Sequence, residues 1–285
     1  MTRSRRWSIG AVAALATLAA LGTSGSVAHP GEEPPPPPAP NADGRYLPDL
    51  VQILPPRVGV AFRSSSLGRR TLLTFSSAME NHGAGPLIVR TASGNAPDGT
   101  LTANQLVSRS DGRRERLAPA LRLRYVRGGG HSHFHLQDFA RYELRTVGGE
   151  SLRRDRKTGF CLGDRYDYTG SARIAGEPAR AIYRSQCGRD RPTLTALTEG
   201  ISVGFGDIYP ARVEGQYIDV TGLPSGRYVL VLRTDPENLL LDMHDDNDAS
   251  SVLVKLVQGS RPHARILSWC SGRVSCPTPG VHGRR

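Results

Sequence analysis

The sequence predicts an all-β fold, a β-sandwich with long irregular loops, and three observations support this prediction. Short apolar segments with alternating polar residues recur along the chain, as strands with one buried face require. Clusters of glycine, proline, aspartate and serine separate these segments and mark turns. No stretch shows sustained helical periodicity except a weak run around residues 105–118, and the sequence contains no internal repeat. Many short strands at this spacing are typical of a sandwich.

Nine segments carry the strand pattern. In chain order they are residues 58–63, 71–77, 87–91, 122–126, 139–145, 201–205, 216–220, 227–233 and 251–257. The pair 216–220 and 227–233 flanks Pro224-Ser225-Gly226, which predicts two strands joined by a tight turn. A further strand is expected at His131–His135, for reasons given below.

The N-terminus has the features of a secretory signal over residues 1–28. Three arginines precede an apolar stretch over residues 9–21, and small residues follow at 26–28. The apolar stretch is too short to span a bilayer, so we expect export with cleavage near Ala28 and no stable membrane insertion. Arg5-Arg6 partly matches a twin-arginine signal, which leaves the export route open.

The rest of the chain divides by composition into three parts. Residues 29–44 contain five consecutive prolines and predict an extended linker. Residues 45–257 then form one domain, long enough to bury a substantial core. Residues 258–285 are expected to be a C-terminal tail with a local disulfide.

The chain is basic, with 37 Lys and Arg against 26 Asp and Glu, a net charge of +11. Three of the arginines lie in the predicted signal, so the mature chain would carry 34 basic residues against 26, or +8. This charge favours acidic partners. The basic residues are scattered and no nucleic-acid recognition motif is present, so we expect a solvated arginine-rich surface and no nucleic-acid partner.

The cysteines suit an oxidising compartment and two disulfides. There are four, at Cys161, Cys187, Cys270 and Cys276, and three pairings are open. We favour Cys161–Cys187 with Cys270–Cys276, because each pair closes a local loop.

The most informative segment places three histidines at alternate positions, His131, His133 and His135, directly behind three glycines. Alternate residues of a strand share a face, so the three imidazoles would project toward one spot. Imidazole is the commonest nitrogen ligand for copper, zinc and iron. In a straight strand the outer two Cα atoms would be roughly 13 Å apart, so one shared ion requires the strand to curve or bulge. The alternative is an exposed histidine face that binds no metal.

Lys157 attracts attention through composition alone. The chain contains only two lysines, Lys157 and Lys255, beside 35 arginines. A lysine kept in such a chain suggests that its amine is needed, since arginine stays protonated and cannot act as a nucleophile. An ordinary surface lysine would explain the same observation.

These residues together resemble the lysyl oxidases. The run His131 to Leu144 is similar to that family's copper motif, in which an acidic residue, an aromatic residue and a Tyr-acidic-Leu strand follow the alternate histidines. Lys157, three residues before Phe160-Cys161-Leu162, stands in the place of the family's cofactor lysine. Tyr209, inside Asp207-Ile208-Tyr209, stands in the place of its cofactor tyrosine. The similarity extends from residues 48–51 to residues 245–252.

The resemblance implies a secreted copper amine oxidase with a lysine tyrosylquinone made from Lys157 and Tyr209. Copper would be held by His131, His133 and His135. The substrate would be a primary amine, including the lysine side chains of proteins, and molecular oxygen would be the oxidant. Aldehyde, hydrogen peroxide and ammonia would be the products. The quinone would act as the electron sink, while the protein supplies position and proton transfer.

Asp138, three residues beyond His135, is the predicted general base. An ideal strand would turn its carboxylate to the opposite face, so it reaches the site only if the strand is irregular. A carboxylate that orients a copper histidine, or one on the surface, is the alternative.

A second metal is implied by the resemblance at the acidic segment 245–251. Calcium favours clustered oxygen ligands, and Asp49, Asp245 and Asn247 are the candidates. Ser250 and Ser251 replace the paired asparagines of the family, which leaves a solvated acidic turn as the alternative. The vertebrate enzymes also carry more cysteines, and here Cys161 alone occupies a clearly matching place.

Two other classes of function compete with the oxidase. A non-catalytic copper-binding sandwich would need the histidines but neither Lys157 nor Tyr209. An adhesion module would use the sandwich as a scaffold, with an incidental metal. The ordered match of Lys157 and Tyr209 favours the oxidase, and a covalent link between them would separate the three.

Overall fold

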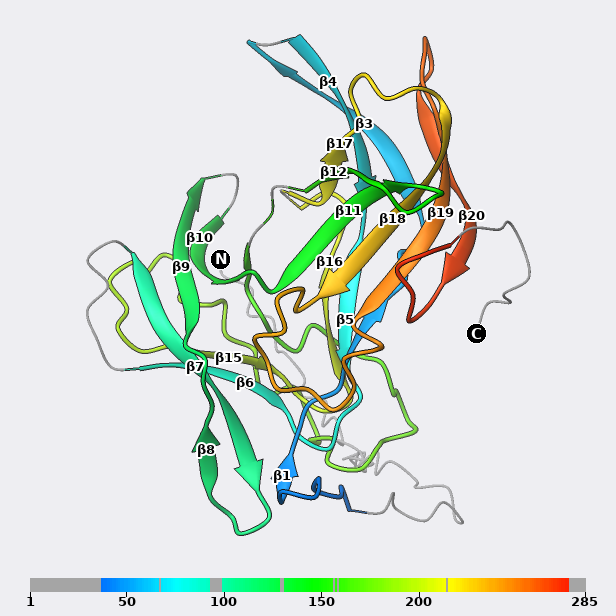
Figure 1. Cartoon of the computed structure of the whole chain (residues 1–285). Coiled ribbons are helices and arrows are strands. Elements are labelled where there is room, and N and C mark those ends of the chain that lie inside the picture. Colours follow the sequence, from blue (N-terminus) through cyan, green and yellow to red (C-terminus); the bar gives the residue numbers. More distant parts are fainter. Residues whose placement is uncertain are drawn as a thin grey trace, which may run out of the picture. The chain divides into compact units, whose positions relative to one another are not determined.

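The computed structural model describes residues 37–276 except 67, 93–98, 129–130, 156, 158 and 214. The predicted signal peptide, the first part of the linker and the last nine residues lie outside the described residues. Within them the chain forms twenty strands and no α-helix, and every strand pair is antiparallel (Figure 1). The predicted all-β fold is confirmed. No helix long and apolar enough to cross a membrane occurs in the ranges that the structure describes.

One layer of the sandwich is a five-stranded sheet in the order β12-β11-β18-β19-β20. Its strands are β11 (Ala140–Thr146), β12 (Ser151–Arg154), β18 (Gly226–Thr234), β19 (Ala249–Val257) and β20 (His263–Cys270). The central strands are apolar on both faces. Leu230 and Leu232 enter the main core, whereas Val229 and Val231 join a smaller cluster on the other face, closed by the Cys270–Cys276 disulfide. The boundary predicted at residue 257 therefore does not end the sheet.

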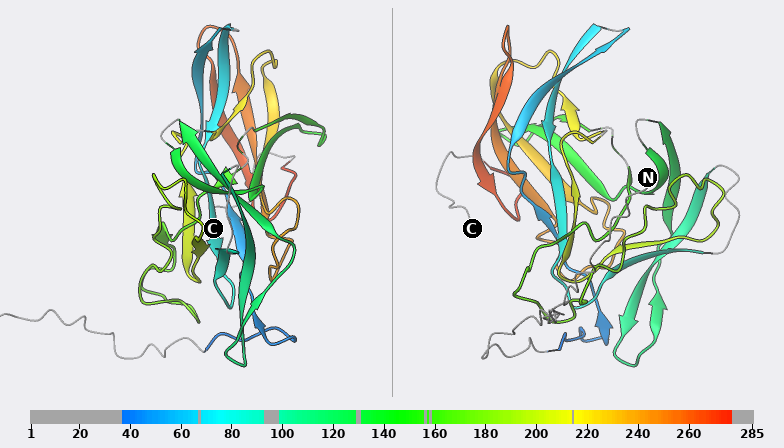
Figure 2. Two further views of the ribbon diagram at one scale, coloured as in Figure 1. Left: turned by 90° about the vertical axis from the view of Figure 1, so that its left-hand side faces the viewer. Right: turned by 180° about the vertical axis from the view of Figure 1, so that it is seen from behind.

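The facing layer consists of two smaller sheets that one stretch of chain connects. The three-stranded sheet has the order β17-β4-β3 and the four-stranded sheet the order β14-β16-β5-β2. Their strands are β2 (Leu50–Ile53), β3 (Val58–Ser65), β4 (Gly68–Phe75), β5 (Ser77–Asn81), β14 (Tyr166–Asp167), β16 (Phe205–Tyr209) and β17 (Tyr217–Asp219). The chain passes from β4 to β5 with a break at Ser76. β3 lies beside β20 where the two layers meet (Figure 2).

An eight-stranded sheet lies to one side of the sandwich (Figure 1, left) and contains the histidine strand. Its main path is β13-β10-β9-β7-β6-β15, with β1 and β8 paired to β7. The strands are β1 (Arg45–Tyr46), β6 (Leu87–Thr91), β7 (Thr100–Arg109), β8 (Arg114–Arg116), β9 (Leu121–Gly128), β10 (His131–Gln137), β13 (Gly159–Phe160) and β15 (Thr198–Ile201).

A single apolar cluster joins all of these sheets. It contains Leu50 of β2, Leu73 of β4, Leu123 of β9, Phe134 of β10 and Leu230 of β18, all fully buried. Full burial of such a side chain contributes about 1.5–3 kcal/mol relative to exposure. The sheet that carries β10 is thereby fixed against the sandwich that carries β16.

Three predicted elements need correction. The weak helical run at 105–118 is a hairpin of β7 and β8, because Asp111-Gly112 forms a turn in which Gly112 has φ +81°. The predicted strand 201–205 spans the end of β15 and the start of β16, and Gly204 turns the chain between them at φ +81°. The predicted strand 71–77 divides at Ser76 into β4 and β5.

Candidate metal and cofactor site

The histidine strand β10 projects two imidazoles to one spot. His133 and His135 are 7% and 6% exposed, and their Nε2 atoms lie 2.9 Å apart. Phe134, between them, points the opposite way into the core. Pairing with β9 keeps a continuous register from His131 to Leu136, so the strand is not bulged there. The backbone of His131 belongs to β10, and its side chain lies outside the described residues.

Two segments hydrogen-bond to the other edge of β10, and a disulfide joins them. β13 pairs with Leu136 and Gln137, while the N–H of Phe134 donates to the carbonyl of Cys187 at 2.8 Å. The Cys161–Cys187 disulfide, confirmed by the structure, connects Cys187 to the residue that follows β13. The disulfide therefore links the two segments that border this edge of the histidine strand, and we call β13, Cys187 and the disulfide the frame of the strand.

Gly159 lets this frame approach the histidines. A Cβ atom at Gly159 would lie 2.7 Å from the Cβ of His135 and 2.5 Å from Nε2 of Gln137. Both distances are shorter than the contacts that Cβ atoms make in proteins, so a side chain at position 159 would push the histidine strand away. Gly159 stands two residues after Lys157, which brings the predicted cofactor lysine close to β10.

Lys157 and Tyr209 meet at the ring of Phe160. The Lys157 Nζ atom lies 4.8 Å from the centroid of the Phe160 ring and 5.3 Å from that of Tyr209. The two rings contact edge to face at 4.7 Å with an interplanar angle of 85°. Gly215 packs on the lysine stem, since a Cβ there would be 2.9 Å from the Cβ of Lys157. The two residues predicted to form one cofactor are thus brought together.

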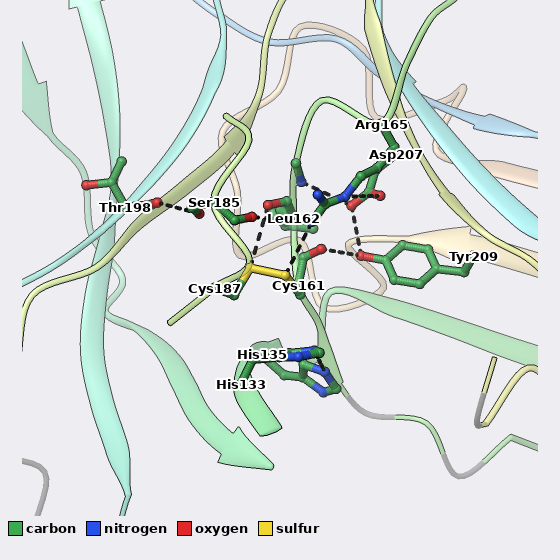
Figure 3. The surroundings of a disulfide bond; sticks show 11 residues. His133, His135, Cys161, Leu162, Arg165, Ser185, Cys187, Thr198, Asp207 and Tyr209 are labelled. Atoms are coloured by element: carbon green, nitrogen blue, oxygen red, sulfur yellow. Dashed lines mark hydrogen bonds and ion pairs between the residues drawn. A yellow bond between two sulfur atoms is a disulfide. The ribbon is translucent and has the colours of Figure 1, made fainter. Parts of the chain in front are cut away.

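The hydroxyl of Tyr209 lies between two oxygen atoms, 2.8 Å from the carbonyl of Cys161 and 2.8 Å from Oδ2 of Asp207 (Figure 3). Tyr209 is 8% exposed and Asp207 1%. Burial, then the neighbouring carboxyl of Asp207, raise the pKa of Tyr209 well above its ordinary value. Burial raises the pKa of Asp207 to about 7, against the opposing charge of Arg165, whose Nε is 3.7 Å from Oδ1.

A second buried carboxyl, Glu199, lies beside the disulfide. Its side chain is fully buried, and one of its oxygens is within 4.8 Å of the sulfurs of Cys161 and Cys187. Because these sulfurs are bonded to each other, the three residues are not a metal site. Neither carboxyl oxygen makes a well-aligned hydrogen bond to the described residues, although the backbone of Leu162 lies close. Burial, followed by the charge of Asp207, raises the pKa of Glu199 far above its ordinary range.

A sequence model of the lysyl oxidase family matches residues 112–261, just over half of the chain. The chain belongs to the lysyl oxidase family. It is 26% identical to Homo sapiens lysyl oxidase homolog 1 over 217 residues, 73% of this chain and 33% of that protein. It is also 28% identical to Gallus gallus protein-lysine 6-oxidase over 144 residues, 50% of this chain and 29% of that protein. The chain thus spans about a third of the length of these relatives.

The matched region of this lysyl oxidase family member contains the three histidines, Lys157 and Tyr209. Of these, the structure brings Lys157 to Tyr209 and His133 to His135. Asp138 has a different setting. It follows the end of β10 at φ 59°, in the left-handed region, and its carboxylate forms an ion pair with Arg122 of β9 at 3.3 Å. The carboxyl group that contacts Tyr209 is Asp207.

The second predicted metal site of this family member lies at the start of β19, where acidic residues gather from two parts of the chain. Asp49 accepts hydrogen bonds from the Asn247 amide at 2.7 Å and from His244 at 3.1 Å. Burial and nearby carboxylates raise the pKa of Asp248 to about 8 and that of Asp242 to about 6. Buried Oδ1 atoms of Asn247 and Asp248 lack hydrogen-bond partners among the described residues.

The sequence of this lysyl oxidase family member did not indicate four further carboxyl groups as site residues: Asp207, Glu199, Asp242 and Asp248. A signal existed for Asp207, because residues two apart on one strand share a face and Asp207 therefore lies on the same side of β16 as Tyr209. No comparable signal marks Glu199, since its importance arises from burial beside a disulfide.

Proposed function

We propose that this chain is a secreted copper amine oxidase that carries a lysine tyrosylquinone formed from Lys157 and Tyr209. It would oxidise primary amines to aldehydes with molecular oxygen and release hydrogen peroxide and ammonia. The observation that carries the proposal is the 5.3 Å approach of the Lys157 amine to the centre of the Tyr209 ring, inside a family whose model matches this region. A copper-binding protein without this chemistry would not require that contact.

The described histidines fit a copper ion. Their Nε2 atoms, 2.9 Å apart, have the separation of two ligands that lie about 2.0 Å from one metal at a right angle. Both rings are buried, and imidazole nitrogen is a preferred donor for copper. His131, two residues before His133 in β10, is the proposed third ligand, because alternate residues of a strand are expected to share a face. Copper bound there would supply, with oxygen, the electron transfers that convert the Tyr209 ring to a quinone.

The residues around Tyr209 would orient the reaction. Phe160 contacts the Tyr209 ring edge to face, which limits its rotation, and also lies beneath the Lys157 amine. Gly215 leaves room for the lysine stem. The Lys157 amine must lose its proton before it can form a bond to the ring. Burial of the ring also keeps competing nucleophiles away from it.

The names of the relatives support a substrate class. Five of these relatives are named protein-lysine 6-oxidase, and we propose that lysine side chains of proteins are substrates of this chain as well. The predicted signal peptide and the two disulfides support an extracellular location. We further propose that the acidic cluster with Asp49, Asp245 and Asn247 binds calcium. Burial and the repulsion between carboxylates raise the pKa of Asp248, and a dication would relieve that repulsion.

Two substitutions test the oxidase. Lys157→Arg keeps the positive charge but presents a guanidinium that stays protonated, and Tyr209→Phe keeps the ring but removes the phenol oxygen. Lys255→Arg and Tyr217→Phe are matched controls, because Lys255 is an exposed residue of β19 and Tyr217 lies on β17. Copper-loaded wild type and both controls should absorb visible light, react with phenylhydrazine and release peroxide from a primary amine.

Both site variants should fold and bind copper but lose the chromophore and the peroxide signal together. If either one retains wild-type peroxide production, the quinone mechanism is wrong here. A non-catalytic copper-binding sandwich would then describe the protein better.

A further inference from the structure

The Tyr209 hydroxyl contacts two oxygen atoms, and its single hydrogen can serve only one of these two contacts. The hydroxyl lies 2.8 Å from the Cys161 carbonyl, which can only accept, and 2.8 Å from Oδ2 of Asp207. A phenol has a single hydrogen to donate. If it donates to Cys161, Asp207 must be protonated to complete the second hydrogen bond; if Asp207 is ionised, the phenol proton points at it. The pair thus has two arrangements that differ by one proton on Asp207.

We propose that Asp207 is a catalytic residue that accepts the phenolic proton of Tyr209 when the ring is prepared for oxidation. The proposal rests on the proposed function, in which Tyr209 becomes part of the cofactor. The O–H bond of Tyr209 breaks, a new O–H bond forms on Oδ2 of Asp207, and the electron pair stays on the phenolate oxygen. No oxidant takes part in this step. It produces the electron-rich ring that copper and oxygen would then oxidise.

Several features allow Asp207 to change its protonation state. Burial opposes its charge, whereas Arg165 on one side and the N–H of Gly163, 3.2 Å from Oδ2, stabilise it. These opposing effects place its pKa at about 7, the range in which a carboxyl both accepts and releases protons at neutral pH. Arg165 is partly exposed, so its guanidinium stays in contact with water while it stabilises the ionised carboxylate of Asp207.

Other ionisable groups face Asp207 from the neighbouring elements. Glu199 of β15, Tyr166 of β14 and Tyr142 of β11 are close enough for its charge to affect them. Burial raises the pKa of each one, which favours its neutral form. Arg165 supplies the positive charge that lowers the pKa of Asp207. The predicted base Asp138 instead pairs with Arg122 on β9.

The first test uses copper-free protein and does not measure enzyme activity. Carbon-detected NMR of the side-chain carboxyls should find one group that titrates near neutral pH and is missing in Asp207→Asn. In Tyr209→Phe this titration should shift upward, because the ionised carboxyl loses a hydrogen-bond donor. If no such group titrates near neutral pH, or if Tyr209→Phe leaves its titration unchanged, the proposal is overturned.

The second test follows formation of the chromophore after copper is added in air. In wild type the rate should rise as the pH passes through about 7, and Asp207→Asn should be slower by about 100-fold with no such rise. Glu143→Gln is the matched control for loss of a buried carboxylate, since Glu143 pairs with Arg145 and Arg154 away from Tyr209. A normal rate in Asp207→Asn rejects this proposal alone, whereas a wild type that never forms a chromophore rejects the proposed function with it.

Discussion

Raising the pH of calcium-free protein from about 6 to about 8 is expected to destabilise it through the acidic cluster before β19. Asp248 is buried, and burial together with the charges of Asp242, Asp235, Asp245 and Asp49 raises its pKa to about 8. In the unfolded chain the same carboxyl ionises near pH 4 (about 3.9). The native protein therefore holds a proton that the unfolded chain has released, and stability falls as the pH rises through this range.

The expected size of this effect follows from the two pKa values. One such carboxyl lowers the free energy of unfolding by about 2 kcal/mol between about pH 6 and pH 8. Asp207, with a pKa of about 7, acts in the same direction, so a variant must isolate the cluster. Asp248→Asn removes the ionisation and should reduce the fall by about 2 kcal/mol. Asp246→Asn, at an exposed neighbouring position, is the matched control and should keep the wild-type slope.

Urea unfolding at both pH values, with chelator or with millimolar calcium, measures these differences. Calcium binds ionised carboxylates of the native state, so it should raise the Tm more at the higher pH than at the lower one. The reasoning is refuted if the calcium-free protein is equally or more stable at the higher pH, or if Asp248→Asn keeps the full slope. Absence of any calcium effect on the Tm would remove the calcium site.

Three further predictions concern the histidine strand and its frame. The protein should bind one copper ion per chain through nitrogen ligands, and the electron paramagnetic resonance spectrum should change in His133→Ala and His135→Ala; an unchanged spectrum in both would exclude these ligands. Gly159→Ala, which places a methyl group 2.7 Å from the Cβ of His135, should weaken copper binding and cost about 1–3 kcal/mol of stability, and wild-type affinity for copper in this variant would contradict the packing argument. Replacing Cys161 and Cys187 by alanine opens a loop with a sequence separation of 26 and should lower the free energy of unfolding, measured with a denaturant, by about 3.5 kcal/mol. A decrease below about 1 kcal/mol would show that the disulfide contributes little to stability.

The sequence was sufficient where one local rule decides the structure. Alternation along 131–135 predicted the strand and the shared face of His133 and His135, because side chains of a strand repeat every two residues. Short loops also predicted both disulfides correctly. The assignment of Lys157 and Tyr209 to one site came from the resemblance to a family, since the two residues are far apart in the sequence and no local rule joins them.

Errors occurred where turns or tertiary burial decide the outcome. The run 105–118 had apolar spacing compatible with a helix, but the Asp111-Gly112 turn makes a hairpin more stable. Residues 258–285 were expected to be a tail with a local disulfide, whereas β20 within them pairs with β19, and burial of Cys270 and Cys276 fixes it in the sheet. Asp207 owes its properties to the removal of water by distant segments, which spacing along the chain does not reveal.

The most direct test of the central claim is peptide mass analysis of copper-loaded protein matured in air. The account predicts a covalent link between the peptide that contains Lys157 and the peptide that contains Tyr209 in the wild type and in Lys255→Arg. The link should be missing from Lys157→Arg, from Tyr209→Phe and from protein kept free of copper. Finding the two peptides unlinked in matured wild type that contains copper would contradict the account.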